Sequence, residues 1–438
     1  MGRREARLGR ALAIANLLIK DVTLIDGTGA PPRAGTDVLI QDGLFAAFRS
    51  TAPGEEAEVL DGSGKFLVPG LWESHTHLRP ILKGDEEASQ AALDDAMRAY
   101  LRRGITTVVD LGGPTDVFHR MRDRHRTGGI HDCARLLFAG PSFTGIGGWP
   151  LPLHHNPAMV NQAGDAGTAL AKLRALLERR PDVIKVIYDG EPGASDKLPR
   201  QALEAIVAEA HRHGKHVLVH IRTASDALDA LEAGADGVEH TFVPDGPEED
   251  VARATELLAR SGAYLTPTLA AFEQLGRAGD RAYLDELAGE GCLSAGEVDA
   301  LTAPERAWGQ AEFPHHPKVE CRARVVTALR IMPRMQAAGV KWAAGSDIAP
   351  VLSRPEAALR ELVLLARAGV PLMDVISAGS RHAAEKVGAG DRYGTIEPGK
   401  VADALLLDAD PLADVRHLVR PEHLVSAIKD GHQVPTRS

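Results

Sequence analysis

Short apolar segments rich in β-branched residues alternate with amphipathic helical segments between residues 70 and 385, and this alternation restricts the fold more than any other feature. Helical segments such as 165–180 and 198–214 carry apolar residues at helical spacing. Several of them end in glycine, as helix C-termini commonly do. Repeated strand–helix units of this length predict parallel strands covered by helices. Eight segments are expected as strands, which predicts a closed (β/α)8 TIM barrel of the α/β class: 67–77, 105–111, 135–140, 182–188, 215–221, 236–241, 263–268 and 340–346.

The two ends of the chain resemble each other and differ from the middle. Residues 1–69 and 386–438 consist of short strand-like runs separated by glycine and proline turns. We expect them to form one small composite β-rich domain, a β-sandwich, beside a barrel domain of residues 70–385. A helical but irregular insertion, about 270–318, lies between the seventh and eighth strands. It follows a strand end, where such barrels place their active sites, so both a lid and a peripheral decoration are compatible with it.

Composition narrows the function classes. The chain of 438 residues is 44% hydrophobic, which is ordinary for a globular protein, and its formal net charge of −10 argues against a nucleic-acid partner. No apolar run approaches the ~20 residues of a membrane span. The basic N-terminus and the apolar run after it faintly resemble a secretory signal but lack a clear cleavage site. Three cysteines without a CxxC pair indicate a reducing compartment, so we predict a cytoplasmic protein.

Histidines lie at three of the expected strand ends. His75 and His77 close the first strand two residues apart, so both side chains can point to the same side. His220 closes the fifth strand and His240 follows the sixth. Taken singly, each histidine is also compatible with a hydrogen-bonded core role or a chance surface pair. Asp347 closes the eighth strand, where an aspartate often serves only as a helix N-cap.

Lys185 lies inside the apolar run of the fourth strand. Burial of an unpaired ammonium is costly, so a structural salt bridge, a stem that reaches solvent or a lowered pKa must relieve it. A neutral amine can react with carbon dioxide to give a carbamate, an anion with two oxygens that suits a bridge between two divalent metals. The six residues occupy the C-terminal ends of five strands, which is the catalytic face of this architecture. Imidazoles and carboxylates together favour zinc or a similar metal.

The motifs around these residues are similar to those of the amidohydrolase superfamily, in the branch that contains prolidase-like and imidazolonepropionase-related enzymes. The likeness covers almost the whole chain. LVPGLWESHTHL resembles the opening metal motif of that family, VIKVIYDG the strand with a carboxylated lysine, and VLVHI, GVEHT and AAGSD the later ligand strands. GTIEPGKVADALLLDADPL resembles the closing signature of the β-rich domain.

The resemblance implies a role for each residue. His75 and His77 would hold the more buried metal with Asp347, carboxylated Lys185 would bridge, and His220 and His240 would hold the outer metal. A metal-bridging hydroxide would attack the substrate, and Asp347 would act as general base and then as general acid. The cofactors so implied are two divalent ions, zinc favoured, and a carbamate derived from carbon dioxide.

The expected activity is hydrolysis of an amide C–N bond in a small molecule, with dipeptides and N-acyl amino acids favoured. A single-metal deaminase or an imidazolonepropionase-like cyclic amide hydrolase is the alternative, since one metal needs no bridging carbamate. A scaffold that has lost its metal is disfavoured because all six positions are filled. Relatives often carry Gly-Gly-His where this chain has Gly147-Gly148-Trp149, which points to a different mode of substrate binding. A homo-oligomer is compatible with the sequence.

Two further residues near the expected barrel mouth have open roles. Arg222 could bind a substrate carboxylate or pair with a loop aspartate such as Asp226. Tyr188 could donate a hydrogen bond to substrate or pack in the core. The remaining histidine pairs, His154 with His155 and His315 with His316, are interpreted as solvated loop residues.

Overall fold

The computed structural model describes residues 16–48, 57–78, 86–113, 115–127, 132–151, 160–190, 196–242, 248–302, 317–348 and 351–434. The signal-like N-terminus, the two histidine pairs at 154–155 and 315–316, and part of the 270–318 insertion lie outside the described residues. Within that part of the chain, no helix combines the length and the apolar character that a bilayer crossing requires.

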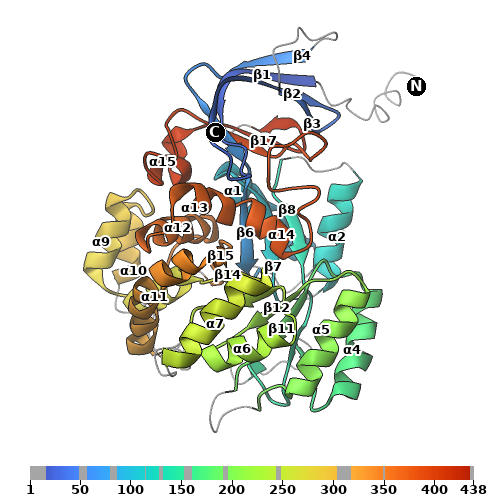
Figure 1. Cartoon of the computed structure of the whole chain (residues 1–438). Helices are drawn as coiled ribbons and strands as arrows, with labels where there is room; N and C mark the ends of the chain where they lie inside the picture. The colour runs from blue at the N-terminus through green and yellow to red at the C-terminus, as the bar shows by residue number, and fades with distance from the viewer. Residues whose placement is uncertain are drawn as a thin grey trace.

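The central part of the molecule is the predicted parallel barrel (Figure 1). β6 and β7 are buried at every position, and the β-branched run of β7 is typical of a strand covered on both faces, whereas β6 carries the polar residues Glu73, Ser74 and His75 into the interior. The eight strands that correspond to the predicted ones are β6 (Leu71–Thr76), β7 (Ile105–Asp110), β8 (Arg135–Phe138), β11 (Ile184–Ile187), β12 (Val217–His220), β13 (Gly237–Glu239), β14 (Tyr264–Thr266) and β15 (Lys341–Trp342).

Two seams close the ring of strands. Between β15 and β6, the Ser74 amide donates to the Ala344 carbonyl at 3.1 Å, and Thr76 forms a parallel bridge with Asp347. Between β8 and β11, the Asp182 amide donates to the Phe138 carbonyl at 2.9 Å. β9 (Ser142–Thr144) also pairs with β11, and β10 (Val160–Gln162) pairs with β9. Closure leaves all strand C-termini on one face, as the sequence predicts for a TIM barrel.

Helices cover the outside of the barrel and bury one apolar face each. In α5 (Arg200–Arg212) the inward side chains include Leu203, Ile206 and Val207. The other covering helices are α1 (Glu86–Arg102), α2 (Thr115–Arg126), α4 (Ala166–Glu178), α6 (Ala224–Glu232), α7 (Glu248–Ser261), α11 (Lys318–Ala338), α12 (Arg354–Arg367), α13 (Leu372–Ala378) and α14 (Arg381–Lys386).

The described part of the insertion contains three helices: α8 (Leu269–Arg277), α9 (Arg281–Gly289) and α10 (Ala295–Thr302). Arg360 of α12 is fully buried and joins two of these helices, because its guanidinium donates to Glu273 of α8 at 2.8 Å and contacts Glu286 of α9 at 3.4 Å. α8 borders the barrel mouth, since Phe272 packs against His240 with 5.8 Å between ring centroids. A lid role stays a prediction.

Both chain ends contribute to a separate eight-stranded sheet, which lies above the barrel in Figure 1. β5 pairs in parallel with β1 and antiparallel with β16, so it joins the N-terminal strands to the C-terminal ones. A second apolar cluster that includes Ile19, Val38 and Leu406 fills this part. The strands are β1 (Asn16–Leu24), β2 (Arg33–Gln41), β3 (Leu44–Ala47), β4 (Ala57–Asp61), β5 (Phe66–Pro69), β16 (Ala404–Leu407), β17 (Leu424–Lys429) and β18 (His432–Val434). α15 (Arg416–Val419) and a short 3-10 turn (Pro421–His423) connect β16 to β17.

Candidate metal centre

The predicted ligands lie at or just beyond the C-terminal ends of five barrel strands. His75 is in β6 and His77 follows it, Lys185 is in β11, and His220 ends β12. His240 follows β13, and Asp347 follows β15 at the seam with β6. Parallel register therefore brings residues as far apart as positions 75 and 347 to one mouth.

Asp347 lies beside both histidines of the first strand. Its Oδ1 is 3.1 Å from His77 Nε2 and 3.7 Å from His75 Nε2. Its amide donates to the His75 carbonyl at 2.6 Å, and its φ of 62° is in the left-handed region. Pairing of Asp347 with β6 holds this strained backbone in place, and the carboxylate lies toward the imidazoles. Burial opposes ionisation, but nearby His75, His77 and Lys185 lower the pKa of Asp347 below its ordinary value.

His220 and His240 form the other side of the cluster. Their ring centroids are 4.4 Å apart, and His240 is 5.2 Å from His75 by the same measure. His240 Nδ1 is 2.7 Å from Thr268 Oγ1, and His220 Nε2 is 3.4 Å from Asp189 Oδ2. Burial lowers the pKa of His240, and it lowers the pKa of His75 to about 4. Both imidazoles are therefore neutral at physiological pH and keep a lone pair for a ligand.

Lys185 is buried, and its Nζ has no hydrogen-bond partner among the described residues. Burial lowers its pKa to about 8, against the opposing effect of Glu239 and Asp347. Its charge in turn lowers the pKa values of His75, His240 and Asp347, so the amine is electrostatically coupled to the cluster. Of the remedies considered for a buried lysine, the structure contains no salt bridge to Nζ within the described residues.

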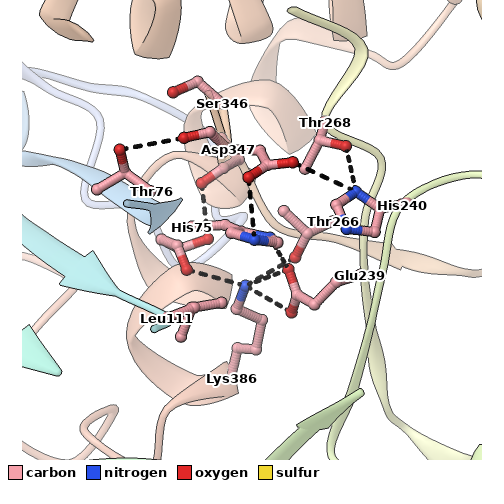
Figure 2. Close-up of polar contacts among 12 residues, drawn as sticks. His75, Thr76, Leu111, Glu239, His240, Thr266, Thr268, Ser346, Asp347 and Lys386 are labelled. Carbon is pink, nitrogen blue, oxygen red and sulfur yellow. Dashed lines mark hydrogen bonds and ion pairs between the residues drawn. The ribbon is translucent and has the colours of Figure 1, made fainter. Parts of the chain in front are cut away.

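A buried carboxylate and ammonium hold His75 from below the cluster (Figure 2). Glu239 Oε2 is 2.6 Å from His75 Nδ1, and Lys386 Nζ is 3.1 Å from Glu239 Oε1. Lys386 also donates to Thr266 Oγ1 at 2.7 Å and to the Ser74 carbonyl at 3.2 Å. An ionised Glu239 accepts a hydrogen bond from the Nδ1–H of His75, which leaves the Nε2 lone pair of this ring available on the side of Asp347.

Glu73 fixes the backbone on both sides of the barrel seam. Its Oε1 accepts from the His75 amide at 2.9 Å and from the Ser346 amide at 3.0 Å. Burial raises the pKa of Glu73 to about 7, although these hydrogen bonds favour the ionised form. The first and eighth strands are therefore held in register at the residues that precede the candidate ligands.

The donor set fits a divalent metal. His75, His240 and Asp347 each offer one ligand atom, and these atoms lie within 4.8 Å of one another. Two neutral imidazoles, an ionised carboxylate and an adjacent buried amine without a partner match the oxygen and nitrogen ligands that zinc accepts.

The two residues with open roles are both engaged within the protein. Tyr188 lies three residues after Lys185, so strand alternation places it on the opposite side of β11. It belongs to the main core, and its hydroxyl donates to Asp229 Oδ2 at 2.9 Å. The alternative of a hydrogen bond from Tyr188 to substrate is therefore not supported, and core packing describes its position.

Arg222 forms an ion pair, but with a different partner from the expected one. Its Nη2 is 3.2 Å from Glu320 Oε1 of α11. Asp226 instead accepts from the backbone amides of Arg222 and Thr223, because it caps the start of α6. The sequence did not indicate Glu320, since it lies about a hundred positions away on a helix that follows the insertion.

Sequence reasoning also missed the residues that support the ligands. The sequence could have indicated Glu239 and Asp189, because both are acidic residues at the end of a buried strand. Glu239 precedes the candidate ligand His240, and Asp189 follows the strand of Lys185. Lys386 carried none, since a lysine near a helix C-terminus usually faces solvent. His382, on the same helix as Lys386, contacts the Trp342 carbonyl at 2.9 Å through Nδ1 and so has a structural role.

Comparisons with known proteins identify a family and a shared fold. A model of the amidohydrolase family matches residues 66–434. The chain is 24% identical to ochratoxinase from Aspergillus niger over 448 residues, a match that covers 93% of this chain and 84% of that protein. It is 29% identical to N-acyl-D-aspartate deacylase from Alcaligenes xylosoxydans xylosoxydans over 191 residues, which cover 40% of this chain and only 36% of that protein. A solved Xaa-Pro dipeptidase with bound methionine superposes with a TM-score of 0.73 at 22% identity, over 96% of this chain and 99% of that one, and shows the shared fold.

Proposed function

The chain belongs to the amidohydrolase family and is a hydrolase of C–N bonds, and from this premise we propose that it cleaves an amide bond in a small molecule with two divalent metal ions. Zinc is the metal we propose. N-acyl amino acids and dipeptides are the favoured substrates, because two relatives at low identity are named as a deacylase and a dipeptidase.

The observation that carries the proposal is the buried amine of Lys185, which has no hydrogen-bond partner among the described residues. Conversion of this amine to a carbamate would replace an uncompensated cation by an anion. Each of the two carbamate oxygens could then bind one metal. His75, His77 and Asp347 would complete the site of the first metal, and His220 and His240 would complete the site of the second. Bound metals would acidify the attacking water and polarise the scissile carbonyl.

The protein's own groups supply the remaining chemistry. Asp347, kept ionised by its surroundings, takes the proton of the attacking water and then delivers it to the leaving nitrogen. Glu239 and Thr268 fix the Nδ1 sides of His75 and His240, so these rings cannot rotate away from the cluster. Lys185, as a carbamate, no longer competes with the metals as a cation.

Metal analysis combined with an assay panel tests the proposal. Protein loaded with zinc or manganese and bicarbonate is expected to hold two metals per chain and to hydrolyse members of a panel of dipeptides and N-acyl amino acids. With ¹³C-bicarbonate, a carbamate carbon signal should appear, and it should vanish in Lys185→Met but persist in Lys20→Met, an exposed strand lysine. Turnover of esters or phosphotriesters with no amide cleaved would contradict the proposal.

The number of metal ions per chain distinguishes the alternative, a single-metal deaminase or cyclic amide hydrolase, from the proposed two-metal enzyme. The alternative predicts close to one metal per chain, an unmodified Lys185 and no response to bicarbonate. No contact in the described residues favours it over the two-metal reading, because the buried amine of Lys185 would then stay without a partner.

A further inference from the structure

Two guanidinium groups converge on one carboxylate beside the candidate metal centre. Glu320 Oε1 is 3.2 Å from Arg222 Nη2 and 3.5 Å from Arg324 Nε. Arg222 follows β12, whereas Glu320 and Arg324 are one turn apart on α11. The exposed fraction is 20% for the Arg222 side chain and 25% for that of Glu320, but only 4% for that of Arg324. The group therefore extends from a partly accessible rim to a buried floor.

Arg324 is poorly satisfied for a buried cation. Its Nε makes no hydrogen bond, and its ion contact with Glu320 is long. Its Cζ lies 4.6 Å from the centre of the Phe272 ring, which contributes a cation–π contact but accepts no directed hydrogen bond. A guanidinium has five N–H donors, and a buried charged donor without a hydrogen bond costs free energy. The Nε–H of Arg324 is therefore a buried donor that an additional anion could satisfy.

Arg324 is also close to the metal ligands. The Phe272 ring contacts both the Arg324 guanidinium and the His240 imidazole. A single aromatic ring therefore links the guanidinium to a candidate metal ligand. Asp189, the partner of His220, is a second carboxylate in this region; burial opposes its ionisation, but the hydrogen bond and charge of His220, with smaller effects of Arg222 and Arg324, lower its pKa below the ordinary value. Asp189 Oδ2 lies 3.4 Å from His220 Nε2, so this carboxylate is directed at a candidate metal ligand.

We propose that Arg324 and Arg222 bind the carboxylate of the substrate, and that Glu320 is the competing anion which this carboxylate displaces. The proposal rests on the proposed function and narrows its substrate class to amides that carry a carboxylate close to the scissile bond, as N-acyl amino acids and dipeptides do. In an N-acyl amino acid, three bonds separate the scissile carbonyl carbon from the carboxylate carbon, a span of about 4 Å at most. Arginine forks suit such a planar anion.

The arrangement predicts opposite effects for two neighbouring residues. Arg324→Gln should weaken binding of a carboxylate ligand, whereas Glu320→Gln should strengthen it, because the competitor loses its charge. A merely structural role of this ion group would weaken binding in both variants. Arg330, exposed on the same helix, offers a matched control through Arg330→Gln. Arg222→Gln, at the rim, provides a second test if the buried substitution impairs folding.

The experiment measures affinity separately from turnover. N-methanesulfonyl-L-alanine and its D-form lack the scissile carbonyl, and each has an uncharged carboxamide counterpart. Isothermal titration of zinc-loaded protein should show about tenfold or greater preference for the acid over the carboxamide in the wild type and in Arg330→Gln. The preference should fall toward unity in Arg324→Gln and Arg222→Gln and increase in Glu320→Gln.

The outcomes distinguish the two proposals. Equal or undetectable affinity for acid and carboxamide in the wild type overturns the carboxylate site, even if the panel shows that amides are hydrolysed. An unchanged preference in both arginine variants, with folding verified by circular dichroism, overturns it too. Conversely, acid-selective binding that is lost in Arg324→Gln, without hydrolysis of any amide, supports the carboxylate site and contradicts the proposed function.

Discussion

The pair formed by Lys386 and Glu239 yields a quantitative prediction, because both side chains are fully buried and oppositely charged. Replacement of Lys386 by methionine keeps most of the side-chain volume but leaves Glu239 with His75 as its remaining partner. The two charges are 3.1 Å apart, which corresponds to about 5 kcal/mol at an effective dielectric constant of 20. Removal of one partner of a buried ion pair commonly costs about 3–5 kcal/mol.

We therefore expect Lys386→Met to lower the free energy of unfolding by about 3–5 kcal/mol at pH 7. The double variant Glu239→Gln/Lys386→Met should regain part of this loss, because it leaves no unpaired buried charge. Lys20→Met, at an exposed strand position, should change stability by less than about 0.5 kcal/mol. Urea unfolding followed by tryptophan fluorescence measures these differences, with zinc content determined in parallel.

The direction of the pH dependence provides a second check on the same variant. Without Lys386 the buried carboxyl of Glu239 should have a raised pKa, so the native state gains a proton that the unfolded state lacks. The stability of Lys386→Met should then increase relative to wild type as pH falls from 7 toward the unfolded pKa of Glu, about 4.3. A Lys386→Met protein within about 1 kcal/mol of wild type at pH 7 would refute the reasoning, as would a double variant less stable than the single one.

Three further predictions follow from the site and its support. Gly345→Ala should abolish metal binding or impair folding, because a Cβ there would lie 2.6 Å from His75 Cβ and 2.8 Å from its backbone nitrogen; zinc content against Gly289→Ala, an exposed position in α9 with open space around it, measures the difference. Asp347→Asn should lower kcat by about a hundredfold or more while the protein stays folded, since proton transfer is lost, and a kcat within threefold of wild type would contradict its role. Arg135 and Lys429 lower the pKa of Asp430, despite the opposing effect of burial, so its stabilising contribution is present above the unfolded Asp pKa of about 3.9 and is lost as pH falls through the lower folded value; Asp430→Asn should therefore reduce the urea midpoint at pH 7 more than at pH 3, and an equal reduction at both would count against the ion pair.

The sequence was sufficient where local periodicity and parallel register determine position. His75 lies in β6 and His77 directly follows it, His220 ends β12, and His240 and Asp347 follow strands that end on the same face of the barrel. The same alternation rule, applied from Lys185, assigns Tyr188 to the opposite face of β11, so that residue could have been placed correctly from sequence alone.

The supporting shell depended on tertiary contacts that periodicity does not encode. Lys386 meets Glu239 only because the short helix α14 packs against the inner strands. Glu320 and Arg324 are four residues apart on α11, so helical spacing alone indicates their contact, but the burial of Arg324 and the approach of Arg222 depend on how α11 packs against the barrel. Side chains of Arg and Lys are expected at surfaces, and these exceptions become visible only in three dimensions.

The pairing of β5 with both β1 and β16 has a consequence for biosynthesis. While the ribosome translates the barrel, the edge of β5 that later meets β16 stays without its partner strand, over more than three hundred codons. Nascent or prematurely terminated chains therefore present an open strand edge of apolar character, which invites association with other chains. Pairing of β16 with β5 covers this edge once the last strands have left the ribosome. We expect dependence on chaperones to be greatest just before that point.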